Sequence, residues 1–181
     1  PSDVSALRAV KSRLPWLALN MITAMASAAV LSFFEDTIAQ IAVLTAFMPI
    51  VAGVSGSSAT QTMTVTVRGL ALGEIELKSA MQTILKELII GLIDGVALGL
   101  IVTLIAVLWK GNPMLGVVVG ISVFLNLICA ALAGVFVPMV MERLKFDPAL
   151  ASPILVTTST DTLGYLIYFS IATAIILPLM T

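Results

Sequence analysis

The 181-residue sequence contains no histidine and a single cysteine, Cys129. The absence of histidine excludes histidine-based acid–base catalysis and histidine metal ligation. A lone cysteine inside an apolar segment cannot form a disulfide within the chain. Charged residues make up only 10% of the sequence, against about 25% in an average soluble domain. Because the formal net charge is −1 and no basic run occurs, the composition indicates that no nucleic acid is a partner.

Apolar residues are abundant, at 60% of the chain with a mean hydropathy of +1.15. A spanning helix needs about 20 predominantly apolar residues, and the chain holds five apolar runs of at least that length. We therefore predict an all-α membrane protein that forms one transmembrane domain over residues 1–181. The polar and basic residues 1–13 are predicted to form a cytoplasmic juxtamembrane segment. The five expected transmembrane helices cover approximately residues 14–34, 37–67, 88–109, 114–141 and 148–178.

The basic residues are distributed unevenly between the two sides that these five spans define. One side holds only Lys110, whereas the other holds Arg8, Lys11, Arg13, Arg68, Lys78, Lys86, Arg143 and Lys145. The positive-inside rule places the richer side in the cytoplasm. We therefore expect a cytoplasmic N-terminus, an outside C-terminus and a multi-pass protein of the cell (inner or plasma) membrane. Since the sequence begins with Pro1, we also expect an excised domain whose preceding part is soluble.

One acid, Asp161, lies near the middle of the last predicted span. An ionisable side chain at that depth is costly unless it faces a partner, a cavity or an ion. Pro153, Thr157 and Asp161 are spaced i, i+4 and i+8 and therefore share a helix face. Pro153 has no N–H to donate, which frees the carbonyl of Ala149. A carboxylate, a hydroxyl and free carbonyls are oxygen ligands of the kind that Mg²⁺, Ca²⁺ and Mn²⁺ prefer.

Other polar residues also lie inside the predicted spans. Residues 49–64 are rich in Gly, Ser and Thr, which is typical either of close helix packing or of a helix broken beside a polar cavity. Asp94 of the third span is expected to pair with a Lys or with a nearby helix N-terminus. For Asn20, Asn126, Thr103 and Thr173 we expect hydrogen bonds between helices.

Three hypotheses account for these polar residues: a cation pathway, an intramembrane aspartyl protease, and a subunit whose polar groups only join helices. A protease would use Asp94 and Asp161 as a carboxylate pair. The sequence lacks the Gly-x-Gly-Asp setting of such enzymes, and the two acids fall at different depths, so we do not expect an enzyme. No Lys, Arg or His neutralises Asp161 at its depth. Two copies facing each other across a two-fold axis would need a cation between their carboxylates, and a hydrated divalent ion fits there.

Two motifs resemble the membrane domain of MgtE-type magnesium channels, and the resemblance covers essentially the whole chain. The first is Phe47-Met-Pro-Ile-Val-Ala-Gly-Val-Ser-Gly-Ser-Ser-Ala-Thr-Gln-Thr, followed by Val67-Arg-Gly-Leu-Ala-Leu. The second is Asp147-Pro-Ala-Leu-Ala-Ser-Pro, followed by Thr157-Thr-x-x-Asp161 and Gly164. The resemblance implies a homodimeric channel that conducts Mg²⁺, as transported ion, along a two-fold pore lined by the second and fifth helices. It also implies cytosolic regulatory domains outside this chain.

The resemblance also implies a set of metal-binding residues. Asp161 would hold a hydrated Mg²⁺, Thr157 and Pro153 would orient its water shell, and Asp147 would contribute to a gating ion site at the cytoplasmic mouth. Family members often carry Asn at the position of Pro153, so only its carbonyl is available here. The second-span motif, often Gly-Gly-Asn-x-Gly-x-Gln, reads Ser-Gly-Ser-Ser-Ala-Thr-Gln over residues 55–61. A carrier that exchanges Mg²⁺ against Na⁺ or H⁺ is the alternative to a channel.

Overall fold

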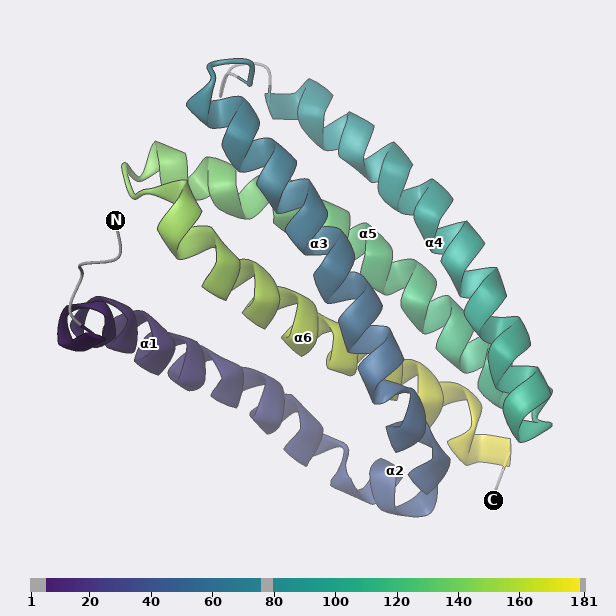
Figure 1. Ribbon diagram of the computed structural model, residues 1–181. Helices are drawn as coiled ribbons and strands as arrows, with labels where there is room; N and C mark the ends of the chain where they lie inside the picture. Colours follow the sequence, from purple (N-terminus) through teal and green to yellow (C-terminus); the bar gives the residue numbers. More distant parts are fainter. Residues whose placement is uncertain (1–5, 76–79, 180–181) are drawn as a thin grey trace.

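The computed structural model describes residues 6–75 and 80–179, and all regular secondary structure in these ranges is helical (Figure 1). Two of the long helices begin at clear sequence signals. Asn112 caps α5 by accepting hydrogen bonds from the N–H groups of Met114 and Leu115, and Asp147 caps α6. In chain order the elements are α1 (Ala6–Phe33), α2 (Glu35–Gln40), the 3-10 helix η1 (Ala42–Phe47), α3 (Met48–Ala71), α4 (Ala80–Lys110), α5 (Pro113–Arg143), α6 (Pro148–Ile175) and the 3-10 helix η3 (Leu177–Leu179).

Helix α5 is the centre of the bundle, because α3, α4 and α6 all pack against it. Helix α3 also packs against α6, so these two helices are neighbours on one side of α5 (Figure 1). Helix α1 has a different position. It packs mainly along α6, and nearly all of its apolar surface stays exposed in a single chain.

The core lies where η1 and the start of α3 meet α5 and α6. Leu44, Phe47 and Val51 are buried there with Tyr168 and Phe169. The Tyr168 hydroxyl donates a hydrogen bond of 2.9 Å to the Leu44 carbonyl oxygen, which satisfies the one polar atom of this large side chain. This contact fixes the end of α6 against the connection that precedes α3.

The membrane class is confirmed. Among the described residues, four helical segments are long and apolar enough to cross a membrane: Ala9–Phe33, Ala42–Ala71, Ala80–Lys110 and Pro113–Arg143. Helix α6 has 28 residues, about 42 Å at 1.5 Å per residue, so its length also suffices. Its middle carries the polar run Thr-Thr-Ser-Thr-Asp-Thr over residues 157–162, which lowers its hydropathy. The count of five spans and the orientation of the termini stay predictions.

The helices differ from the predicted spans at several ends. Residues 1–5 of the predicted juxtamembrane segment lie outside the described ranges, and α1 already begins at Ala6. Helix α4 begins at Ala80 rather than at residue 88, because Lys86 and Glu87, which interrupt the apolar run, favour helix. The predicted span 37–67 is divided, since the chain turns through α2 and η1 before α3 begins at Met48.

Helix α3 runs unbroken through the Gly/Ser/Thr stretch of residues 49–64, so the alternative of a locally broken helix is wrong. Hydroxyl groups in this stretch bond to carbonyl oxygens one turn earlier in the same helix: Ser55 to Val51 at 2.8 Å, and Thr60 to Gly56 at 2.8 Å. The small residues permit close packing instead. A Cβ added to Gly134 of α5 would lie 2.8 Å from the Ala59 carbonyl oxygen of α3.

Candidate cation site

The three residues that the sequence places on one face of α6 do share a face in the structure. Pro153 and Thr157 are exposed in the single chain, and Asp161 is half-buried. Helix α6 continues through Pro153 without ending. Because Pro153 has no N–H, the carbonyl oxygen of Ala149 receives no helical hydrogen bond from it. This face therefore combines one carboxylate, one hydroxyl and one free carbonyl within about three turns.

A cavity of 780 Å³ lies between α6 and α1 at this face. Pro153 and Thr157 line it on the α6 side, together with Ala149. On the α1 side the lining includes Arg13 and other side chains of mixed polarity, namely Trp16, Leu17 and Asn20. Asp161 lies one turn beyond Thr157 on the same face and is not part of the lining.

Hydroxyl pairs hold α6 to α1 on both sides of Asp161. Thr158 donates a hydrogen bond of 2.9 Å to Thr23, and Ser27 and Thr162 lie 3.0 Å apart, oxygen to oxygen. Neither of these α6 hydroxyls hydrogen-bonds to the Asp161 carboxylate. In the described part of the chain, Asp161 forms neither a hydrogen bond nor an ion pair.

Of the four residues expected to join helices by hydrogen bonds, two do so and two do not. The Asn20 side chain lines the cavity between α1 and α6 and forms no hydrogen bond in the described part of the chain. Thr173 pairs with Thr37 of α2 at 3.0 Å, and the Asn126 side-chain amide donates to the Gly164 carbonyl oxygen at 3.3 Å. Both contacts confirm the expected hydrogen bonds between helices. Thr103 instead donates to the Gly99 carbonyl oxygen of its own helix at 2.8 Å, so the expectation was wrong for this residue.

Asp147 is not brought close to Asp161. The two residues stand at positions 14 apart on α6, which is about 21 Å along the axis. The Asp147 side chain accepts a hydrogen bond of 2.9 Å from the Ala149 N–H and so caps the helix. An acid directly before Pro-Ala is itself a helix-start signal, which gives Asp147 a structural role beside any role at an ion site.

A second polar region, which the sequence reasoning did not assemble, lies between α3 and α4. Asp94 lines a groove of 480 Å³ there with Ser57, Ser58 and Gln61 of α3. In the described part of the chain no ion pair joins Asp94 to a basic residue, so the expected pairing with a Lys is not found.

Next to this groove, the Glu87 carboxylate accepts a hydrogen bond of 3.1 Å from the Thr62 hydroxyl and is only 9% exposed. Glu87 directly precedes the third predicted span, which begins at residue 88. The sequence does carry a pattern that predicts the burial of Glu87. Gly91 and Gly95 follow it at i+4 and i+8, and both lie on the face of α4 that packs against α5.

The single chain does not build a metal cage from its own acids. Within residues 6–75 and 80–179, no group of three or more Asp, Glu or Cys side chains is placed to hold one ion. The α6 face therefore offers one carboxylate per chain, and further ligands for an ion would come from carbonyls, water or a second copy.

Comparison with known proteins agrees with this picture of a membrane protein with polar residues inside its helices. Residues 48–171 match the MgtE family, described as a divalent cation transporter. The chain belongs to the MgtE family. It is 39% identical over 174 residues to the magnesium transporter MgtE of Bacillus subtilis, a match that covers 96% of this chain and 39% of the relative.

Two other MgtE magnesium transporters give similar matches. The one from Enterococcus faecalis is 36% identical over 92% of this chain and 37% of its own length. The one from Thermus thermophilus is 35% identical over 89% of this chain and 36% of its own length. The chain thus spans less than two fifths of the length of each relative. Membership in a transporter family contradicts the protease hypothesis and confirms that the protein is not an enzyme.

Proposed function

We propose that this chain is the ion-conducting membrane domain of a divalent-cation transporter, with Mg²⁺ as the transported ion. The observation that carries the proposal is Asp161, a half-buried carboxylate on a polar helix with no hydrogen bond or ion pair in the described chain. A cation is the natural neutralising partner for such an acid. The relatives, which are named magnesium transporters, support Mg²⁺ as the ion.

We further propose that two copies form the pore around a two-fold axis, lined by α3 and α6. Helices α3 and α6 are neighbours on one side of α5 (Figure 1). Helix α3 keeps open surface in the single chain, since a Cβ added to Gly53 or Gly56 would meet nothing within 4 Å. A second copy would bring a second Asp161 to the axis and supply the carboxylate that one chain lacks.

The residues around Asp161 suit a hydrated ion better than a bare one. Mg²⁺ sheds its water reluctantly and is commonly held by one or two carboxylates through its water shell. In the proposed site Asp161 supplies the charge, and the Pro153 carbonyl oxygen and the Thr157 hydroxyl accept hydrogen bonds from the bound waters. The Thr157 carbonyl oxygen is less available, because it lies inside the helical hydrogen-bond ladder and also accepts a bond of 3.0 Å from the Thr160 hydroxyl.

Asp147 has a separate place in the proposal, at the start of α6 and about 21 Å from Asp161. One of its carboxylate oxygens caps the helix. The other oxygen is available for an ion at the mouth of the pore, where the cytosolic regulatory domains implied by the family resemblance would act. Both the mouth site and those domains are parts of the proposal.

The proposal is tested by Mg²⁺ uptake into proteoliposomes that contain this chain. Asp161→Ala and Asp161→Asn should abolish uptake or remove its preference for Mg²⁺, while the dimer persists in cross-linking. Asp94→Asn is the matched control, because it removes an intramembrane carboxylate from the α3–α4 groove and should leave uptake near the parent level.

The same assay separates a channel from a carrier. A channel conducts Mg²⁺ down its gradient with no counter-ion, whereas exchange requires Na⁺ or H⁺ on the opposite side. Unchanged uptake in both Asp161 variants would overturn the assignment of the site, and absence of uptake by the parent chain would overturn the proposed function.

A further inference from the structure

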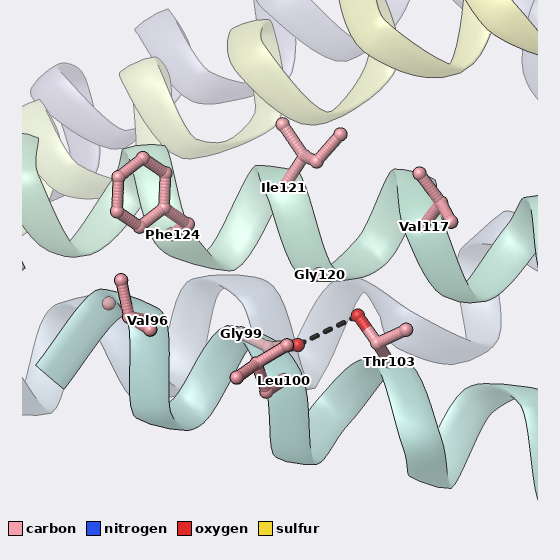
Figure 2. A pocket seen from close by; sticks show the side chains of 9 residues that line it. Val96, Gly99, Leu100, Thr103, Val117, Gly120, Ile121 and Phe124 are labelled. Atoms are coloured by element: carbon pink, nitrogen blue, oxygen red, sulfur yellow. Dashed lines mark hydrogen bonds between the residues drawn. The ribbon is translucent and has the colours of Figure 1, made fainter.

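An apolar groove of 410 Å³ runs between α4 and α5 (Figure 2). Its walls are Val96 and Leu100 on α4 and Val117 and Ile121 on α5, and Phe124 lies at one end (Figure 2). All four wall residues are exposed by more than a third in the single chain. Because α4 and α5 are long and apolar enough to span a membrane, a groove between them lies at a depth that lipid acyl chains reach.

Glycines form the floor of the groove and keep its shape. A Cβ on Gly99 would lie 2.9 Å from the Gly120 carbonyl oxygen, and a Cβ on Gly95 would lie 3.0 Å from Phe124. The two backbones therefore approach too closely for either helix to shift into the groove. The one hydroxyl in the lining, that of Thr103, is bonded to the Gly99 carbonyl oxygen, as the dashed line in Figure 2 marks. The lining thus has no free side-chain donor for a polar ligand.

A single positive charge lies beyond the open end of the groove. Lys110 is seven residues after Thr103, two helical turns away, and is therefore on the groove side of α4 at about 10 Å. Its ammonium group lies 4.2 Å from the ring centre of Trp109, an aromatic residue typical of the membrane–water interface. Between residues 95 and 141, Lys110 is the only charged residue of the sequence. The N-terminus of α5, directly after it, adds positive potential.

We propose that this groove binds one anionic glycerophospholipid, with its phosphate at Lys110 and one acyl chain between α4 and α5. The dimensions agree, because Thr103 to Gly95 extends about 12 Å along the helix, enough for roughly the middle half of a fatty acyl chain. The positive charge of Lys110 favours an anionic headgroup, and the apolar lining of the groove favours the hydrocarbon chain.

This lipid site is separate from the proposed ion path. Val117 of the groove and Asn126, which bonds to Gly164 of α6, are nine residues apart on α5. Nine residues make two and a half turns, so the two side chains face opposite sides of the helix. The inference therefore stands whether or not the chain conducts Mg²⁺.

The test is native mass spectrometry of the delipidated chain, titrated in detergent with phosphatidylglycerol or with phosphatidylcholine of the same acyl chains. We expect one phosphatidylglycerol to bind about fivefold more tightly than phosphatidylcholine, the effect of about one basic residue at the membrane surface. Lys110→Gln should remove this preference. Ile121→Trp and, independently, Val96→Trp should fill the groove and weaken binding of both lipids.

Two matched controls accompany these variants. Leu108→Trp adds the same bulk at an exposed position of α4 outside the groove, and Lys145→Gln removes a charge at the opposite end of the hairpin. Both should bind lipid as the parent does. Equal binding of the two lipids, unaffected by Lys110→Gln and by both tryptophan variants, would overturn the proposal. So would a loss of dimer, rather than of lipid, in both tryptophan variants, since a second copy would then occupy the groove.

Discussion

Thr158 of α6, three residues before Asp161, donates a hydrogen bond of 2.9 Å to the hydroxyl of Thr23 on α1. With the Ser27–Thr162 pair one turn further on, this contact fixes the rotation of α6 about its axis. The face that carries Pro153, Thr157 and Asp161 thereby lies beside these hydroxyl pairs, and its Pro153 and Thr157 line the cavity between α6 and α1. The position of α1 thus sets the direction in which the proposed ion site faces.

The α1–α6 contact should be measurable as a coupling energy. Thr23→Val and Thr158→Val each remove one partner of the bond, and the double variant removes both. In a double-mutant cycle of the free energy of unfolding, we expect a coupling of about 0.6 kcal/mol, the average for such bonds inside membranes. Thr64→Val is the control, since the Thr64 hydroxyl bonds to the Thr60 carbonyl oxygen of its own helix. Thr64→Val should show no coupling to Thr158→Val, and a coupling near zero for Thr23 and Thr158 would contradict the contact.

Helix packing gives a second prediction. Gly134→Ala should lower the free energy of unfolding by about 1–3 kcal/mol, because the new Cβ would lie 2.8 Å from the Ala59 carbonyl oxygen. Gly53→Ala is the matched control, since nothing lies within 4 Å of its added Cβ and alanine favours helix. Thermal unfolding in detergent compares the two. A Gly134→Ala protein as stable as Gly53→Ala would mean that α3 and α5 are further apart than described here.

The sequence predicted the fold class and the α6 face well, because each depends on local patterns. Apolar runs marked the four apolar spans, and the spacing of Pro153, Thr157 and Asp161 placed them on one face. The sequence did not predict the unbroken course of α3. There the Ser and Thr hydroxyls bond to their own helix backbone, and composition alone does not distinguish this from a broken helix.

Burial was harder to predict than helix position. Glu87 lies at the edge of an apolar run, and Asp94 lies inside the same run. Glu87 is buried against Thr62 and Asp94 faces a groove, because helix α4 is turned toward α3 by its contact with α5. That rotation depends on a neighbour far away in the sequence, as does the position of α1 along α6.

The two roles of Asp147 can be separated by substitution. Asp147→Asn keeps an oxygen that accepts the Ala149 N–H but removes the charge, whereas Asp147→Ala removes both. Asp147→Ala should therefore cost about 1 kcal/mol of unfolding free energy, and Asp147→Asn much less. If Asp147 also binds an ion at the mouth of the pore, both variants should change the dependence of uptake on Mg²⁺ concentration. An unchanged dependence in both would leave Asp147 as a helix cap only.

The measurement that tests the central claim most directly is Mg²⁺ uptake by chains mixed with Asp161→Asn chains in equal amounts before the dimers form. If two Asp161 carboxylates share one ion on a two-fold axis, only dimers with both acids conduct, and uptake should fall to about one quarter of the parent value. If each chain carries its own path, uptake should fall to about one half instead. A value near one half would contradict the shared site at Asp161.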